Sequence, residues 1–467
     1  MSFLSYKVLS DITGGTWVNV DDIDVNSVVI KHVHSNEYDI ESGALVVPRG
    51  MSSFKFGTAR RLIKKFNSNV AGLLVDDTFD LVDIDQPVLV VNHVSEALSS
   101  LAQFSRSQFK GSVVAITGSV GKTSTKKMLN HILSEHGKVF YEEGTGNIIP
   151  AISRQLINLK DEDYALLEIS SAALPVSSKV AAPYIAILTS VAPAHLSDLG
   201  TLSNVAKRKS TIFEGLSHNG WAIINRDIPY FDEVFEYASK FTSNVLTYGE
   251  HDLSDMKLVG YNQYEQSVVV SYENNSIDYK LAAQGKHFAI NSMACLLAAS
   301  LLGMSLSDAS RFMFSFSPEK RRGNLVNISV KGGHASVIDE SYNANPVSMV
   351  AALDSFSNVE VSDAGRKLIV LADMAALGKD ASTYHKDLAE YVVKSGVDKV
   401  FLLGPNMKFL WEMLPESIRG GYFISIDVLC EKLSPELFSN DIIMIKGSNS
   451  MRLNKLVDFL TNVHKLN

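Results

Sequence analysis

Short apolar runs alternate with longer amphipathic stretches along most of the chain. Runs typical of buried strands lie at 113–117, 164–170, 184–191, 221–227, 335–341, 367–374, 399–404 and 441–447. They are spaced far enough apart for crossover helices, and the first run is followed at once by a helical pattern over 125–137. Strands that alternate with helices in this way are typical of parallel α/β sheets.

The pattern divides the chain into three regions. Shorter strand runs at 27–33, 43–50, 72–77 and 87–94 surround an amphipathic helix expected over 58–67, which predicts a small N-terminal α/β domain. The polar segment 105–111 has the composition of a linker, and a β-rich insert over 257–283 precedes a helix expected over 288–303. A length of 467 residues also favours about three domains. The sequence therefore predicts domains at 1–107, 108–316 and 317–467.

Composition and charge narrow the class of protein. An apolar fraction of 46 % and a charged fraction of 20 % exclude an intrinsically disordered chain. The net charge of −8 shows no electrostatic preference for nucleic acid or acidic membranes. The sequence has neither a long apolar run nor a signal-peptide pattern, so we expect a cytoplasmic protein. Cys295 and Cys430 lack metal-ligand spacing and are expected to be buried thiols.

The strongest chemical signal is the segment TGSVGKTST at 117–125, between an apolar strand and a helix. Gly118 and Gly121 let backbone N–H groups approach phosphate oxygens, and the helix N-terminus favours an anion. Lys122 is suited to neutralise phosphate charge, and the Thr123 hydroxyl is suited to ligand Mg²⁺. Ile116 stands where the full phosphate-loop motif has its first glycine. The context still favours nucleotide binding over an incidental glycine-rich turn.

This loop resembles the ATP loop of the Mur ligases, which join an acid to an amino acid or peptide through an acyl phosphate. Similar segments follow in the order of that family over nearly the whole chain. They are centred on Glu168, His195, Lys209, Asn291, Arg322, the stretch DESYNANPVSM from Asp339, Asp373 and Lys446. The last four segments most resemble the MurF type.

The resemblance implies an α/β protein with the three-domain Mur-ligase architecture. The N-terminal domain would bind the acid, the central P-loop domain with its parallel sheet would bind ATP, and a Rossmann-like C-terminal domain would bring the amine. The implied activity is the addition of D-Ala-D-Ala or a related amine to a UDP-MurNAc-peptide in peptidoglycan precursor synthesis. ATP and Mg²⁺ are the implied cofactors. A monomer acting on small-molecule acid and amino acid or dipeptide substrates, without nucleic acid or membrane, is expected.

The resemblance also assigns roles to residues of the central region. Lys122, Glu168, His195 and Lys209 match catalytic positions. Thr123, Glu168 and His195 match metal positions, and a carbamoylated Lys209 would ligand a second Mg²⁺. Neighbouring Lys207 competes for the last role, and the segment AKRKS is also compatible with a solvated basic helix face. The nucleotide would contact Gly118, Ser119, Gly121, Lys122, Thr123, Ser124, Asn291, Arg322 and Asp339.

The amine substrate is expected at the C-terminal region. Matching positions are Asn343, Asn345, Pro346, Asp373, Lys446 and Ser448, several of them at strand ends, where open α/β sheets bind ligands. Lys446 is suited to hold a substrate carboxylate. His385 is equally compatible with the surface and with this pocket.

Several positions depart from the MurF pattern. Asn36, Glu37 and Tyr38 stand where the family has an Asp-Ser-Arg segment that helps to hold the uridine diphosphate. An added carboxylate at an anion site disfavours a diphosphate. Further departures are Ala172, Ala173, Ser190, Phe288 and the shortened stretch GNIIPA from Gly146.

Three readings of the function follow from these departures. The chain is a divergent peptidoglycan ligase, a Mur-type ligase recruited to another acid in a different biosynthetic pathway, or a non-catalytic ATP-binding partner protein. The intact Lys122, Thr123, Glu168, His195 and Lys209 argue against the last reading.

Overall fold

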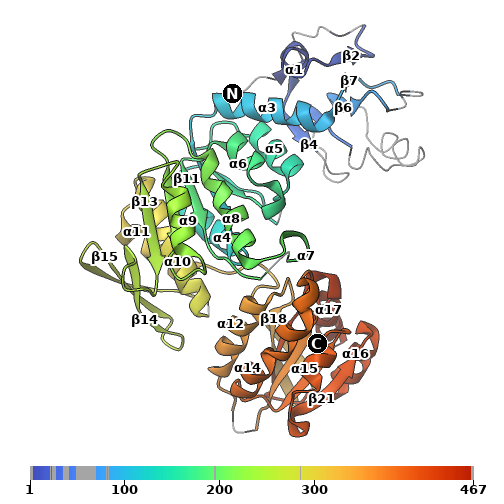
Figure 1. Cartoon of the computed structure of the whole chain (residues 1–467). Helices are drawn as coiled ribbons and strands as arrows, with labels where there is room; N and C mark the ends of the chain where they lie inside the picture. The colour runs from blue at the N-terminus through green and yellow to red at the C-terminus, as the bar shows by residue number, and fades with distance from the viewer. Residues whose placement is uncertain are drawn as a thin grey trace.

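The computed structural model describes most of the chain, namely residues 4–21, 23, 28–34, 42–48, 70–79, 81, 84–144, 146–193, 196–283, 285–362 and 364–463. The helix expected over 58–67, the positions Asn36, Glu37 and Tyr38, and His195 lie outside the described residues. Figure 1 shows the N-terminal part, the central part and the C-terminal part following one another along the molecule, each built around its own sheet.

The N-terminal part contains a mixed sheet whose strand order is β2-β7-β6-β5-β4. Its strands are β2 (Thr16–Val18), β4 (His32–His34), β5 (Ala44–Val46), β6 (Gly72–Asp76) and β7 (Val88–Val91). β2 pairs antiparallel with β7, and the other neighbours are parallel. A small antiparallel pair, β1 (Leu4–Ser5) with β3 (Val29–Ile30), lies beside helix α1 (Tyr6–Thr13). The predicted small α/β unit is therefore present.

The segment expected to be a linker is helical instead. Helix α3 runs over Val94–Gln108 and packs on α5 (Ile149–Ile157) of the central part. The Arg106 guanidinium donates hydrogen bonds from Nε to the carbonyl of Ala181 at 2.7 Å and from Nη2 to the carbonyl of Ala182 at 3.0 Å. Apolar side chains recur at helical spacing through the middle of α3 and fill one hydrophobic cluster with those of α5. Within this last turn Ser105 is buried, Arg106 bonds the central part, and only Ser107 and Gln108 are exposed, so the linker prediction is wrong for residues 105–108.

The central sheet carries the parallel strands predicted from the apolar runs. Its order is β16-β15-β14-β13-β12-β11-β8-β10-β9, and its parallel part consists of β8 (Ser112–Thr117), β9 (Val139–Phe140), β10 (Tyr164–Glu168), β11 (Ile185–Leu188), β12 (Trp221–Asn225), β13 (Val245–Gly249) and β14 (Met256–Asn262). The β-rich insert extends the same sheet with the antiparallel strands β15 (Ser267–Tyr272) and β16 (Asn275–Lys280).

Alternate residues of the central strands face opposite layers, which explains why the strands are continuous apolar runs. Val113 and Ala115 of β8 join the cluster beneath α5, α6 (Val176–Ala181), α8 (Leu202–Ser210) and α9 (Phe231–Ala238). Val114 and Ile116 join the opposite cluster, formed with α4 (Lys122–Leu133) and α10 (Lys286–Leu301). Both cysteines are buried as expected: Cys295 lies in α10, and Cys430 lies in α16 (Ile426–Leu433).

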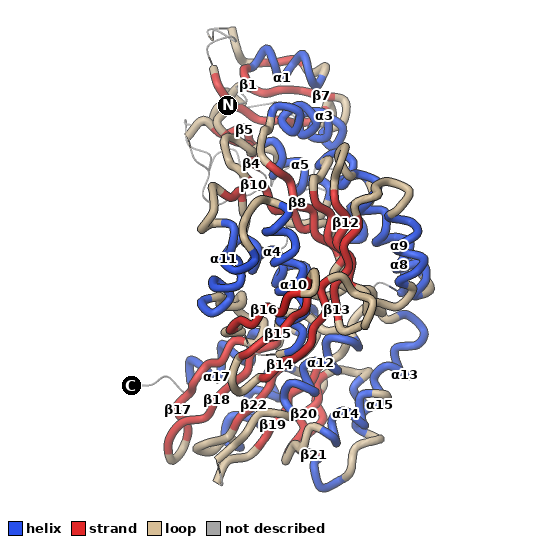
Figure 2. The backbone as a smooth tube through the Cα atoms, turned by 90° about the vertical axis from the view of Figure 1, so that its left-hand side faces the viewer, coloured by secondary structure: helices blue, strands red, loops and turns tan. Residues whose placement is uncertain are grey.

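The C-terminal part is an open, mostly parallel sheet, visible in the lower half of Figure 2. Its order is β17-β18-β22-β19-β20-β21, with β17 (Asn324–Val330), β18 (Gly333–Glu340), β19 (Lys367–Ala372), β20 (Lys399–Leu403), β21 (Arg419–Phe423) and β22 (Ile442–Lys446). The edge strand β17 is antiparallel. Helices α12 (Pro346–Ser357), α14 (Leu388–Lys394) and α15 (Met407–Trp411) cover one face, and α16 and α17 (Asn454–Val463) cover the other. Among the described residues, no helix is both long and apolar enough to cross a membrane.

Candidate active site

The phosphate loop lies where β8 ends and α4 begins. Gly121 adopts a left-handed conformation with φ of +86°, and α4 starts at the next residue. A Cβ atom on Gly118 would lie 2.0 Å from Oγ1 of Thr189, so the close approach of two loops requires glycine there. The N–H groups of the first turn of α4 provide an anion-binding end for a phosphate.

The loop backbone is fixed by the segment that follows β11. Oγ1 of Thr189 donates to the carbonyl of Val120 at 2.6 Å, and the N–H of Val120 donates to Oγ of Ser190 at 2.8 Å. Oγ of Ser119 accepts from the N–H of Ala192 at 2.9 Å and donates to its carbonyl at 3.0 Å. Ser190, one of the departures from the family pattern, therefore supports the phosphate loop.

A carboxylate and a hydroxyl meet beside this loop. Oγ1 of Thr123 donates to Oε2 of Glu168 at 2.6 Å, and Nδ2 of Asn147 donates to the other oxygen, Oε1, at 2.8 Å. Glu168 is 2 % exposed, and the parallel pairing of β10 with β8 brings it to the same sheet edge as the phosphate loop. Hydroxyl and carboxylate oxygens are hard ligands of the kind that Mg²⁺ prefers.

Asn147 is a site residue that the sequence reasoning missed. It belongs to the GNIIPA stretch, which stood out only as a shortened motif. The structure makes it the residue that orients Glu168, and it lines the same cavity. A sequence pattern reveals an amide but not the carboxylate that it meets.

Substitution of Asn147 with alanine should raise the Mg²⁺ concentration needed for half-maximal phosphate release by about tenfold or more, because partners that orient a metal ligand typically contribute 10- to 100-fold to metal affinity. Mg²⁺ titrations of the purified variant measure this. The exposed Asn275, changed to alanine, serves as the control and should titrate like the unmodified protein. An unaltered Mg²⁺ dependence in N147A would contradict the orienting role.

Lys209 is buried in the same region, and its hydrogen-bond partner is a hydroxyl group rather than a carboxylate. It is 3 % exposed on α8, and its Nζ donates to Oγ of Ser171 at 2.8 Å. Burial lowers the pKa of Lys209 well below its usual value, and the charge of Lys122 lowers this pKa further. Lys207 is exposed and does not line the cavity. The structure thus distinguishes the two candidate lysines: Lys207 lies on the solvated helix face, and Lys209 faces inward.

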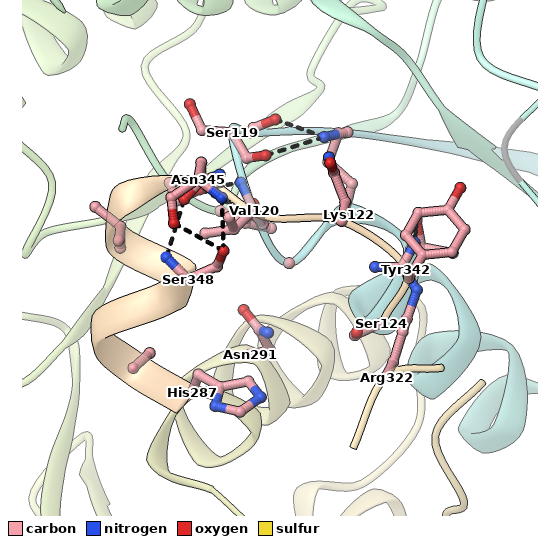
Figure 3. Close-up of a pocket in the computed structure, with 18 of the residues that line it drawn as sticks. Ser119, Val120, Lys122, Ser124, His287, Asn291, Arg322, Tyr342, Asn345 and Ser348 are labelled. Atoms are coloured by element: carbon pink, nitrogen blue, oxygen red, sulfur yellow. Dashed lines mark hydrogen bonds between the residues drawn. The ribbon is translucent and has the colours of Figure 1, made fainter. Parts of the chain in front are cut away.

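Helix α10 supplies another wall of the site. A Cβ atom on Gly121 would lie 2.9 Å from Oδ1 of Asn291, so this amide lies directly against the phosphate loop. His287 lies one helical turn earlier on the same wall, as Figure 3 shows. Phe288 is 2 % exposed, and its ring lies 6.3 Å from that of Phe316. The family's asparagine at that position is thus replaced by a packing residue.

The C-terminal part closes the site from the opposite side. Nη2 of Arg322 donates to Oγ1 of Thr123 at 2.9 Å. Asn345 caps the N-terminus of α12. Nζ of Lys446 donates to Oε2 of Glu340 at 3.2 Å and to the carbonyl of Asn343 at the same distance.

These side chains line one cavity of about 910 Å³ between the central and C-terminal parts. This volume is within the range of small-molecule and cofactor sites. The predicted residues that line it are Gly118, Ser119, Gly121, Lys122, Thr123, Ser124, Glu168, Lys209, Asn291, Arg322, Asn343, Asn345 and Lys446.

Three other predicted residues do not line this cavity. Asp339 accepts a hydrogen bond from the N–H of Ser341 at 3.0 Å, and burial raises the pKa of its carboxyl group. Ser448 accepts from the N–H of Ala375 at 2.8 Å. Asp373 accepts from the N–H of Met407 at 2.9 Å and thereby holds the start of α15. Their carboxylate and hydroxyl groups satisfy backbone donors of adjacent loops, which residue type and strand-end position alone do not reveal.

The structure contradicts the surface alternative for His385. Its side chain is fully buried, and it is absent from the cavity wall. Nε2 accepts from the N–H of Met374 at 3.1 Å, and Nδ1 donates to the carbonyl of Ala381 at 2.6 Å. Burial lowers the pKa of this imidazole. His385 therefore fixes the loop after β19.

Comparison with known proteins agrees with this arrangement. Residues 116–299 match the Mur ligase middle domain, and residues 321–449 match the family described as Mur ligase, glutamate ligase domain. The chain is 30 % identical to UDP-N-acetylmuramoyl-tripeptide–D-alanyl-D-alanine ligase of Buchnera aphidicola subsp. Baizongia pistaciae, over 80 % of each chain. It is 28 % identical to the enzyme of the same name from Rickettsia prowazekii, over 93 % of this chain and 96 % of that one.

A solved structure of MurF from Acinetobacter baumannii has the same fold, with a TM-score of 0.83, 23 % identity and 99 % of each chain covered. The three-domain architecture expected from the sequence is therefore confirmed. The chain belongs to the Mur ligase family, and within it to the MurF ligases.

Proposed function

We propose that this protein uses ATP to join D-alanyl-D-alanine to the terminal carboxyl group of a UDP-N-acetylmuramoyl-tripeptide, with release of ADP and phosphate. The observation that carries the proposal is the shared cavity. It places the phosphate loop and Glu168 of the central part opposite Lys446 and Arg322 of the C-terminal part.

The chemistry explains why two parts of the chain must meet. A carboxylate is a poor electrophile, so ATP must first convert it into an acyl phosphate, which the amine then attacks. Both steps bring anions together, and catalysis therefore depends on positioning and charge neutralisation. Lys122 is placed to neutralise the transferred phosphate, and Asn291 is placed to contact the adenine ring. Lys446, with Asn343 and Asn345 nearby, is placed to hold the carboxylate of the amine substrate.

The described residues suit a magnesium ion. Thr123 and Glu168 present oxygen atoms at the phosphate loop, and His195, outside the described residues, completes the proposed ligand set. No group of three or more His, Cys, Asp or Glu side chains suited to a metal occurs among the residues described. The oxygen atoms of Thr123 and Glu168 fit Mg²⁺, which is commonly bound by one or two carboxylates together with substrate phosphates. When bound, Mg²⁺ would neutralise charge on the phosphates.

We also propose that Lys209 carries a carbamate. A carbamate forms when a neutral amine attacks CO₂ and releases a proton. The lowered pKa of Lys209 increases the neutral fraction, and the nearby charge of Lys122 stabilises the anionic product. The modified side chain would offer an oxygen ligand to a second Mg²⁺ ion.

We also propose a separate binding role for each of the three domains. We assign acid binding to residues 1–107, ATP binding to 108–316 and amine binding to 317–467. We also expect the protein to act as a monomer. We expect the reaction to take place in the cytoplasm, where ATP is available.

A ligase assay with product mass spectrometry tests the proposal. Phosphate release should require ATP, UDP-MurNAc-tripeptide and D-Ala-D-Ala together, and the product should have the summed mass of the two substrates less one water. Calorimetry with UDP-MurNAc-tripeptide addresses the acid separately. Binding undetectable at about millimolar ligand, corresponding to about −4 kcal/mol, would remove the peptidoglycan assignment and favour recruitment to another acid. ATP binding without turnover over a broad substrate panel would overturn the enzymatic role.

A further inference from the structure

Arg322 lies at the proposed metal ligands rather than in open solvent. Its Nη2 donates to Oγ1 of Thr123 at 2.9 Å, while the same hydroxyl donates to Glu168 at 2.6 Å. The guanidinium thus contributes positive charge at the pair of oxygens proposed to ligand Mg²⁺. Figure 3 shows Arg322 and Tyr342 together beside the start of α4.

The guanidinium is held in this place by residues other than Thr123. Its Nε lies 3.5 Å from Oε2 of Glu319, and its central carbon lies 3.9 Å from the centre of the Tyr342 ring. Tyr141 in turn donates to Oε1 of Glu319 at 3.2 Å. Arg322 is therefore positioned by Glu319, in the segment that joins the central and C-terminal parts, and by Tyr342, after β18.

Two lysines near Glu168 add to the positive charge that Arg322 contributes there. Lys122 and Lys126 both interact electrostatically with Glu168, and the charge of Arg322 lowers the pKa of both lysines. A free divalent cation approaching Glu168 would meet the positive charges of Lys122, Lys126 and Arg322, which Glu319, paired with Arg322, offsets only in part. A metal that arrives with a nucleotide brings several phosphate charges and meets a favourable field instead.

We propose that Arg322 determines how the metal enters, by excluding free divalent cations from Thr123 and Glu168 until a nucleotide is bound. Phosphate oxygens offer the guanidinium a stronger, bidentate partner than a hydroxyl. Arg322 then moves its hydrogen bonds from Thr123 to phosphate, and the hydroxyl becomes available to the metal. This role rests on the metal ligands assigned under the proposed function.

Binding of Mn²⁺ to the nucleotide-free full-length protein, followed by electron paramagnetic resonance, tests this role without any turnover. The unmodified protein should bind free Mn²⁺ weakly, and R322Q should bind it at least about tenfold more tightly, because a cation and a competing hydrogen bond are both removed. R322K keeps the charge and should exclude Mn²⁺ nearly as well as arginine.

R321Q is the matched control, since Arg321 also lines the cavity, whereas the hydrogen bond to Thr123 comes from Arg322. Its affinity for Mn²⁺ should stay within about threefold of the unmodified protein. The double variant R322Q/E168Q should lose the gained binding, which locates the ion. Thermal unfolding measured by circular dichroism verifies that each variant is folded.

Equal Mn²⁺ affinity in R322Q and the unmodified protein would overturn the excluding role. A gain of equal size in R321Q would do the same, since it would show a general charge effect. Failure of the proposed metal site gives a different result. If Thr123 and Glu168 do not hold the metal, Mn²⁺ should bind neither the unmodified protein nor R322Q, even with ADP present. If they hold it and only the role of Arg322 is wrong, Mn²⁺ should bind with ADP to the unmodified protein and to both single variants.

Discussion

Replacing Lys122 with alanine should lower kcat for ATP-dependent phosphate release by about 10²- to 10³-fold, the effect expected when a preorganised charge-stabilising donor is removed. Lys122 is the first residue of α4, the helix that follows the phosphate loop. Its Nζ donates to the carbonyl of Gly118 at 2.8 Å. That position lets it neutralise charge as phosphate is transferred. Steady-state phosphate release with saturating substrates measures the loss.

The same helix provides the control for this prediction. Lys127 is only partly buried on α4 and does not line the cavity, so K127A should retain nearly full activity. A thermal unfolding profile for K122A close to that of the unmodified protein would show that the fold survives. Full activity in a folded K122A would contradict the assignment of the phosphate site.

Replacing Lys209 with alanine should reduce kcat by about 10²-fold, and millimolar acetate or formate should restore part of the activity. A small carboxylate fits the space left by the side chain and supplies the oxygen ligand that the carbamate would have provided. Removing CO₂ and bicarbonate from the buffer should likewise lower the activity of the unmodified protein. Rate measurements with and without added carboxylate test both effects.

The exposed Lys207 makes K207A the matched control, and this variant should retain nearly full activity under both conditions. The lowered pKa of Lys209 gives the expected direction with pH: the amine is more neutral at neutral pH than an ordinary lysine, so carbamate formation proceeds there. Activity of K209A that no carboxylate restores, together with indifference to CO₂, would show that Lys209 does not act through a carbamate.

Periodicity and the phosphate loop could be predicted from the sequence because both are local. The run from Val113 to Ile116 is apolar at every position, as expected for a strand buried on both faces, and glycines follow where the chain must turn. Most of the site residues named from the phosphate loop and the family resemblance lie on the cavity wall. Local information also located strand ends, such as that of Glu168.

Other features depend on contacts between distant segments and could not be read in advance. Asn147 meets Glu168, and Arg322 meets Thr123 across 199 residues, with no local signal for either pair. Asp373 sits at a strand end, as binding residues do, yet its oxygens are already satisfied by the N–H groups of a neighbouring loop. Burial and hydrogen-bond partners, which only the fold supplies, distinguish a ligand-binding carboxylate from a structural one.

The packing of α3 on α5 has a practical consequence for dissecting the molecule. Leu98 and Leu101 belong to the same hydrophobic cluster as Ile152 and Leu156. Dividing the chain near residue 107 would therefore expose hydrophobic surface on both fragments. We therefore expect an N-terminal fragment suitable for separate expression to end near residue 316.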